Sequence, residues 1–221
     1  MEKIIEQVQN WLYLHKLPKE LAGFTLNLEL STCGTRYRIF SYNKPEAYRN
    51  FSVMYDKATK EYLANVVIGL TEYCDINFFA GSLPVLEQIL SERLEYTLTR
   101  LDSFDPSTVE SIFIDKKIIE WPFGFELPPE ISGFKLFIRP CEPVKAINGS
   151  YIIIDYSDFD SESNLIINYN IYRDEFFGEI RIRRTPQMAA EFDSNTLDEL
   201  KEKINACLKD KLEAMRHLIV S

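Results

Sequence analysis

The chain has little of what catalytic loops and membrane spans require. It contains only 8 glycines among 221 residues, and no GxGxxG, GxSxG, HExxH or Walker pattern occurs. Glycine-rich loops that cradle phosphate groups are therefore not expected. No apolar run approaches the roughly 20 residues that span a bilayer, and the first residues lack the basic and apolar stretches of a secretory signal. We expect a cytoplasmic protein that binds no membrane and no cofactor.

A basic excess is missing as well. The chain carries 25 basic and 34 acidic residues, for a net charge of −9. Both halves are acidic, with net charges of −3 for residues 1–105 and −6 for residues 106–221. Binding to a phosphate backbone needs clustered Lys and Arg. Nucleic acid is therefore not an expected partner, whereas a basic protein would suit the acidic surface.

The sequence also lacks a metal-binding pattern. The cysteines, Cys33, Cys74, Cys141 and Cys207, are widely spaced and form no CxxC motif. Such spacing predicts free thiols in a reducing compartment and no zinc site. A reactive thiol at Cys33 is the minor alternative, because only Arg36 lies near enough in sequence to lower its pKa.

The acidic segment 155–162 does not fit a calcium loop either. In an EF-hand that began at Asp158, Ser163 would replace the turn glycine and Tyr169 the bidentate glutamate. The only histidines, His15 and His217, are expected at helix ends, where a cation complements the helix dipole. We therefore expect no metal site and no catalytic residue.

What the chain does have is one segment twice. Residues 17–26 (LPKELAGFTL) recur as residues 127–136 (LPPEISGFKL), at an offset of 110. From Ile39 onward the match continues at an offset of 114, which aligns Tyr55 with Tyr169. This period is longer than that of solenoid repeats. The sequence therefore predicts two tandem copies of one small domain.

We expect an α+β fold in which each copy is an α-β-β-β-β-α unit, with its long helix packed on one face of an antiparallel sheet. The first repeat would cover residues 1–105 and the second residues 106–221. Strands are expected near residues 23–30, 36–43, 50–56 and 61–69, with a further piece near 74–79, and near 133–139, 150–156, 164–172 and 175–184. Helices are expected over residues 2–15, from Leu83 to Leu101 and from Thr196 onward, the last two on apolar stripes. Residues 106–120 fit a helix or a strand, and we favour a helix.

The two copies differ on the outer face of the sheet. If Arg173 and Asp174 form a two-residue turn, the second copy has a solvated outer face that includes Arg181. The first copy has Leu63 and Val67 on that face, so its strand is apolar on both sides. We expect Leu63 and Val67 to be buried by the other copy or to bind a partner, and Arg181 to be exposed.

Arg181, Arg183 and Arg184 form the only dense basic cluster. One interpretation is a site for an anion or an acidic partner, since arginine binds carboxylate and phosphate groups through two hydrogen bonds. The other is a charge ladder with Glu175 and Glu179 on the same face.

Taken together, these features favour a non-catalytic binding protein that engages another protein, as an inhibitor, an immunity-like protein or a chaperone does. The alternative is a small-molecule-binding or enzymatic domain with its pocket at the seam between the two copies. The sequence favours the non-enzymatic function and leaves the oligomeric state open.

Overall fold

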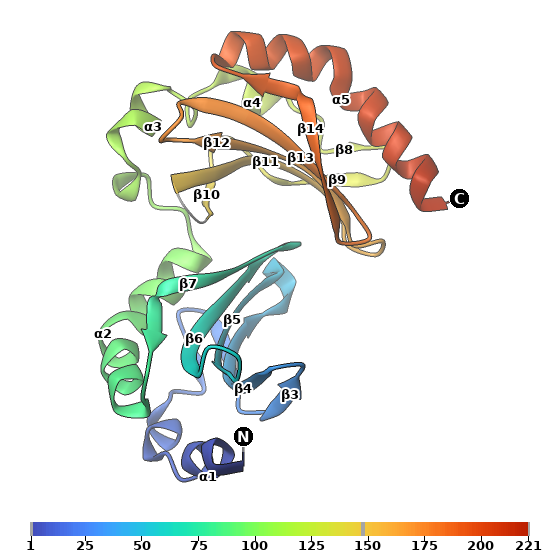
Figure 1. The fold of residues 1–221 in the computed structure, drawn as a ribbon. Coiled ribbons are helices and arrows are strands. Elements are labelled where there is room, and N and C mark those ends of the chain that lie inside the picture. The colour runs from blue at the N-terminus through green and yellow to red at the C-terminus, as the bar shows by residue number, and fades with distance from the viewer. Residues whose placement is uncertain (1, 147–148, 221) are drawn as a thin grey trace. The chain divides into compact units, whose positions relative to one another are not determined.

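The computed structural model describes residues 2–146 and 149–220, except for the side chain of Cys33. The chain divides into two compact units, residues 1–103 and 104–221. In the described residues each unit contains one antiparallel sheet of seven strands together with helices (Figure 1). The fold is therefore α+β, with a two-part, repeat-like layout.

The first unit has the strand order β1-β2-β4-β5-β6-β7, and β3 pairs with β4. Its elements are α1 (Glu2–Gln9), the 3-10 helix η1 (Leu12–Lys16), β1 (Glu20–Leu21), β2 (Phe24–Asn27), β3 (Ser31–Cys33), β4 (Arg36–Lys44), the 3-10 helix η2 (Pro45–Ala47), β5 (Arg49–Asp56), β6 (Glu61–Ile68), β7 (Thr71–Ala80) and α2 (Leu83–Asp102).

The second unit has the strand order β14-β13-β12-β11-β9-β8, and β10 pairs with β11. Its elements are the 3-10 helix η3 (Pro106–Thr108), α3 (Ser111–Asp115), α4 (Pro122–Glu126), β8 (Glu130–Ile131), β9 (Phe134–Ile138), β10 (Val144–Lys145), β11 (Ser150–Asp158), β12 (Ser163–Asn170), β13 (Glu175–Ile182), β14 (Thr185–Ser194) and α5 (Leu197–Val220). The region 106–120 is thus helical where it is regular.

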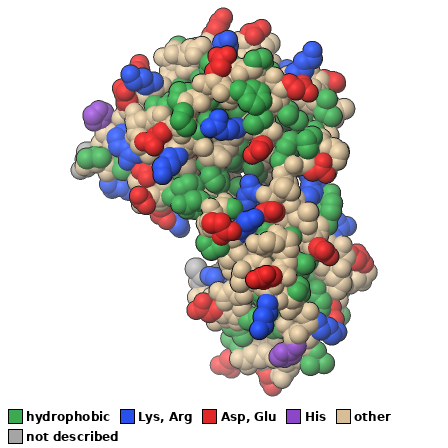
Figure 2. Space-filling view, turned by 180° about the vertical axis from the view of Figure 1, so that it is seen from behind, with side chains coloured by type: hydrophobic (Ala, Val, Ile, Leu, Met, Phe, Trp, Pro, Cys, Tyr) green, Lys and Arg blue, Asp and Glu red, His purple; other side chains and the backbone are tan. Residues whose placement is uncertain are grey.

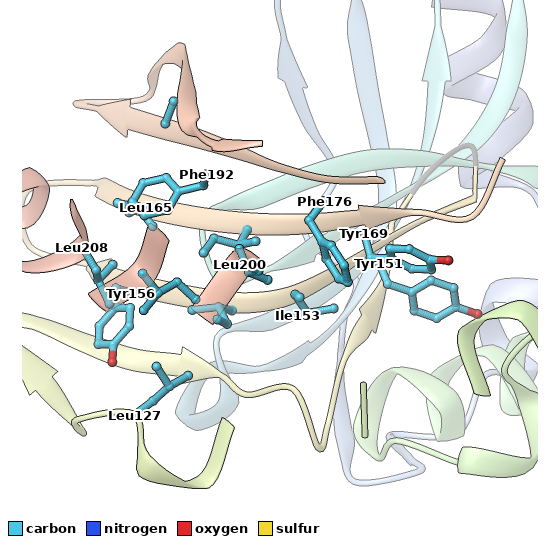
Figure 3. Packing of buried hydrophobic residues seen from close by; sticks show 14 of the residues in the cluster. Leu127, Tyr151, Ile153, Tyr156, Leu165, Tyr169, Phe176, Phe192, Leu200 and Leu208 are labelled. Atoms are coloured by element: carbon cyan, nitrogen blue, oxygen red, sulfur yellow. The ribbon is translucent and has the colours of Figure 1, made fainter. Parts of the chain in front are cut away.

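The long helices α2 and α5 each bury a stripe of leucines. Leu86 in α2 and Leu200 in α5 occupy equivalent positions at the offset of 114, and both are 0% exposed. Leu200 lies beside Phe176 and Ile153 of the second sheet (Figure 3). Because burying a leucine contributes about 1.5–3 kcal/mol, these stripes are a main source of stability in each unit.

The first hairpins of the two sheets have the same turn. Ala22 and Gly23 have φ values of 49° and 77°, and Ser132 and Gly133 have values of 52° and 82°. Two successive positive φ angles define the turn that best matches strand twist, and they favour glycine. The repeated Ala-Gly and Ser-Gly pairs are therefore explained by this geometry.

In each unit, a tyrosine hydroxyl forms a hydrogen bond with the segment that precedes the first strand of the sheet. The Tyr42 hydroxyl donates to the Pro18 carbonyl at 2.8 Å, and the Tyr156 hydroxyl donates to the Pro128 carbonyl at 2.7 Å. The register of the two sheets also shifts at matching places, between Arg38 and Phe40 in β4 and between the residues 114 positions later in β11.

An ion pair joins sheet and helix in both units, with its signs exchanged. Lys44 at the end of β4 pairs with Asp102 of α2, whereas Asp158 at the end of β11 pairs with Arg216 of α5 at 2.7 Å. These residues are equivalent at the offset of 114. Each cation lies against the glycine of the first hairpin, since a Cβ atom at Gly133 would come within 2.7 Å of Arg216 Nη2. Both units therefore have the ionic contact between sheet and helix at the same positions, but the residues that form it differ.

Several expected elements differ from the observed ones. The predicted helix 2–15 ends at Gln9, because Trp11 adopts an extended conformation, is buried, and donates its indole N–H to Glu87 at 2.9 Å. Four strands per unit are too few, since β14 was not expected and the sheets also gain short strands at their edges.

The expected hairpin register is wrong by two residues. Asn170 pairs with Glu175, and residues 171–174 form the turn, in which Asn170 Oδ1 accepts from the backbone N–H groups of Tyr172 and Arg173. A shift of two residues keeps every side chain on its predicted face.

Candidate functional site

The outer face of the second sheet contains a buried polar cluster, formed by Asp155 and Ser157 of β11 and Asn164 of β12. All three are at most 1% exposed. The Ser157 hydroxyl donates to Asp155 Oδ1 at 2.7 Å, and Asn164 Nδ2 donates to the same oxygen at 3.2 Å. The expectation of a solvated face is therefore wrong here, because these side chains contact one another instead of water.

Asp155 supplies the carboxyl group of this cluster. Burial raises the pKa of Asp155 to about 6, although hydrogen bonds from Ser157 and Asn164 and the charge of Arg181 act in the opposite direction. Neither Asp155 Oδ2 nor Asn164 Oδ1 has a hydrogen-bond partner within the described residues. Two buried polar atoms therefore lack the contacts that such atoms normally make.

The three arginines have different partners. Arg181 Nε donates to Glu179 at 2.8 Å, and its side chain is only 19% exposed, which corrects the expectation that it would be exposed. Arg183 donates to the Ile219 carbonyl at 2.8 Å, near the end of α5. Arg184 pairs with Glu162.

Each of these guanidinium groups has a partner of its own. The expected charge ladder is present in part, since Arg181 pairs with Glu179, whereas Glu175 pairs with Arg173. An anion site at Arg181, Arg183 and Arg184 stays a prediction.

Leu63 and Val67 lie on the outer face of β6, opposite Met54 and Asn50 of β5. Leu63 is 3% exposed, whereas Val67 is half-buried. Between them lies Asn65, which is buried as well. This face is therefore mixed apolar and polar, and a binding role for Leu63 and Val67 stays a prediction.

The first unit has an uncharged polar network where the second has Asp155. Asn43 Nδ2 donates to Ser41 Oγ at 3.1 Å, Asn50 Nδ2 donates to Asn43, and Ser52 Oγ donates to Asn50 Oδ1 at 2.6 Å. Ser41 is the equivalent of Asp155 at the offset of 114. Among the described residues, a buried carboxyl group at this position thus occurs in the second unit and not in the first.

The two units also differ at the outermost long strand of each sheet. In the part of the chain that the structure describes, β7 pairs only with β6 and β14 only with β13. Both edge strands depart from regular pairing at equivalent places, after Asp75 and after Ala189. The first six residues of β14 (TPQMAA) carry no charge, whereas those of β7 (TEYCDI) include Glu72 and Asp75.

The uncharged part of β14 is open to solvent. Residues 185–188 and 190 are exposed, and Met188 has 66% of its surface exposed. An edge strand presents unpaired backbone N–H and C=O groups, which proteins usually guard with charged side chains or proline. Pro186 disfavours pairing with a further strand at the start of β14, whereas residues 187–190 include neither a charged residue nor a proline. Residues 187–190 therefore form an edge that is open to pairing.

A groove of about 870 Å³ lies inside the first unit. Its walls come from α1, the β5–β6 hairpin and the start of α2, and they include Trp11, Tyr55, Tyr62, Lys60 and Glu87. The ring centroids of Tyr55 and Tyr62 are 5.0 Å apart in an edge-to-face contact. The groove combines aromatic walls with charges of both signs.

Other kinds of site have little support. Within residues 2–146 and 149–220, no group of three or more His, Cys, Asp or Glu side chains could hold a metal ion. Asp158, the start of the rejected calcium loop, pairs with Arg216 and Ser161 instead. Cys74, Cys141 and Cys207 are free thiols, and the thiol of Cys33 lies outside the described part.

None of the described helices is long and apolar enough to cross a bilayer. Acidic and basic side chains are interspersed on the face shown in Figure 2.

Comparison of the chain with protein-family models, with curated proteins and with solved structures finds no match. The candidate sites therefore depend on geometry alone. Sequence reasoning missed both the buried Asp155 and the β14 edge. The signal for β14 was present, since Thr71 and Phe78 of β7 align with Thr185 and Phe192 of β14.

Proposed function

We propose that the chain is a tandem duplicate of one sheet-and-helix unit and acts as a non-catalytic binding protein. Its second unit engages an extended segment of another protein through residues 187–190 of β14. This activity is compatible with an inhibitor, an immunity-like protein or a chaperone. The observation that carries the proposal is that the edge strand β14 is exposed and uncharged along its first six residues, in contrast to the charged edge strand β7 of the first unit.

Strand addition is the binding mode that such an edge supports. An extended segment that pairs with β14 gains main-chain hydrogen bonds, and its alternate side chains contact the exposed side chains of the edge strand. Pro186 offers no N–H group, so the donors come from the residues after it. Met188 provides an apolar contact on the outer face, next to its pairing partner Glu179.

The chemistry of β14 favours a partner strand of a particular kind. A charge placed against residues 187–190 would lose water without gaining an ion pair, which is unfavourable. We therefore expect an extended segment with uncharged residues along its pairing stretch and an apolar residue opposite Met188. Its length would be short, because the regular pairing of β14 ends at Ala189.

The test introduces a lysine into each edge strand, because a charged side chain there disfavours pairing with another strand. Tagged wild-type protein, Met188→Lys and Ile76→Lys are purified from the native cell, and co-purifying proteins are compared. Ile76 is the matched control, because it is an apolar residue of β7 with 76% of its surface exposed. We expect Met188→Lys to lose a partner that wild type and Ile76→Lys both retain, and hydrogen exchange in that complex to slow at residues 187–190.

Retention of the same partner by Met188→Lys would contradict the proposal, and so would its loss from both variants. Size-exclusion chromatography of the purified protein tests whether β14 pairs with a second copy of the chain. If wild type is a dimer that Met188→Lys dissociates, β14 pairs with a second copy and not with another protein. Melting curves check that both variants stay folded, as substitutions at exposed positions should.

The groove of the first unit supports a second candidate function, the binding of a small molecule. Its volume of about 870 Å³ lies within the range of ligand sites, and its aromatic walls are typical of them. Trp11 lines the groove, so a bound aromatic compound should change tryptophan fluorescence. Loss of that change in Tyr62→Ala, but not in Tyr169→Ala of the second unit, would place the compound in the groove.

A further inference from the structure

Two buried oxygen atoms of the second sheet, Asp155 Oδ2 and Asn164 Oδ1, have no hydrogen-bond partner in the described residues. They belong to two side chains that already share a contact, because Asn164 Nδ2 donates to Asp155 Oδ1 at 3.2 Å. Both residues are 0% exposed. If the carboxyl group is ionised, both orphaned oxygens can only accept, and they cannot satisfy each other.

We propose that, in mild acid, Asp155 is protonated on Oδ2 in the folded protein and donates that proton to Asn164 Oδ1. A carboxylic acid and a primary amide then form a cyclic pair with two hydrogen bonds, one in each direction. This pairing gives both orphaned oxygens a partner and needs no additional group. It also removes the cost of a buried, uncompensated negative charge.

The charged groups around Asp155 do not compensate a carboxylate. On β13, the charge of Arg181 acts on the Asp155 carboxyl group, but Arg181 Nε donates to Glu179 at 2.8 Å, so that charge is shared with Glu179. On β9, Lys135 lies opposite Ser157, and its side chain is exposed. On β12, the partner is the neutral Asn164. Burial therefore outweighs the nearby positive charge, and the pKa of Asp155 is raised.

The protonated pair makes the second unit sensitive to pH. The pKa of Asp155 is higher in the folded than in the unfolded chain, so its contribution to stability is fully present below the unfolded value of 3.8 and is lost as pH rises through about 6. The first unit has Ser41 at this position and lacks this dependence. Mild acid therefore favours the Asp155–Asn164 pair, which has no equivalent in the first unit.

The substitution Asp155→Asn tests the protonation state. An amide at this position can make both hydrogen bonds of the pair at any pH. We expect Asp155→Asn to raise the melting temperature at about pH 7.5 and to have a much smaller effect at about pH 4.5. Asp158→Asn is the matched control, because hydrogen bonds from Ser161 and Arg216 outweigh its desolvation and lower its pKa. It should therefore lower the melting temperature at about pH 7.5 instead.

NMR of the wild-type protein measures the protonation state of Asp155 directly and does not require that Asp155→Asn folds. The ¹³C shift of the Asp155 carboxyl group, followed by NMR in the wild-type protein, should report a protonated acid at about pH 5, where ordinary aspartates are ionised. An ionised group at that pH would overturn the proposal. A lower melting temperature of folded Asp155→Asn at about pH 7.5 would overturn it too, since that result indicates a carboxylate held by Arg181 or by a buried water.

Discussion

Both units join the sheet to the long helix through an ion pair, but the positions of the cation and the anion are exchanged. In the first unit the end of β4 supplies the cation, Lys44, and the helix supplies Asp102. In the second unit the end of β11 supplies the anion, Asp158, and the helix supplies Arg216. The backbone around these pairs matches down to the positive φ angles of the first hairpin. What is shared is therefore the contact between sheet and helix, whichever side provides which charge.

This comparison distinguishes the features that both units share from the features that only one unit has. Tyrosine hydroxyls, hairpin turns and leucine stripes occupy equivalent positions in both units, and all have structural explanations. Two features of the second unit have no equivalent in the first: the buried carboxyl group of Asp155 and the uncharged edge of β14. Features that only one unit has are not needed to build the fold, so they are the stronger candidates for a role in binding.

The largest expected effect concerns the leucine stripes. Leu86→Ala and Leu200→Ala should each lower the free energy of unfolding by about 2–5 kcal/mol, because each leaves a cavity where a fully buried leucine was. Denaturant unfolding measures both values. If the frame is shared, the two losses should be similar, and an unchanged midpoint for either variant would show that its helix does not pack on the sheet.

A smaller effect is expected from reversing the ion pair of the second unit. Asp158→Lys and Arg216→Asp should each cost about 1–3 kcal/mol, since each removes a charged hydrogen bond and brings like charges together. The double variant copies the arrangement of the first unit and should be more stable than either single variant. A double-mutant cycle measures this coupling, and additive losses would mean that the exchanged signs have no structural significance.

The smallest effect concerns the tyrosine hydroxyls. Tyr42→Phe and Tyr156→Phe should each cost about 0.5–1.5 kcal/mol, which is the usual value of one neutral hydrogen bond. Both hydroxyls donate to an equivalent proline carbonyl, so the two losses should agree closely. Thermal melting of the two variants checks this, and a clear inequality would show that the entries to the two sheets are not equivalent.

The identical residues of the repeat were sufficient to predict two similar α+β units, because turns and leucine stripes require particular residue types. The exchanged ion pair was not predictable from identity, since Lys44 against Asp158 looks like a mismatch. The exposure of β14 depends on its place at the edge of the sheet, which the local sequence does not determine.

The sequence places Asp155 in an acidic segment, and charged residues usually lie at the surface. Its burial depends on the pairing of β11 with β12 and β9, which involves residues distant in sequence. The alternative of a small-molecule site at the seam between the copies stays a prediction.

We propose that the second unit binds a partner through its edge strand β14, whereas the equivalent strand β7 of the first unit carries charged side chains. A photo-cross-linking amino acid placed at position 188 or at position 76 compares the exposed side chains of the two edge strands directly. We predict that position 188 cross-links to an extended segment of another protein in the native cell and that position 76 does not. Cross-linking at position 76 alone, equal cross-linking at both positions or no cross-link at position 188 would contradict the claim.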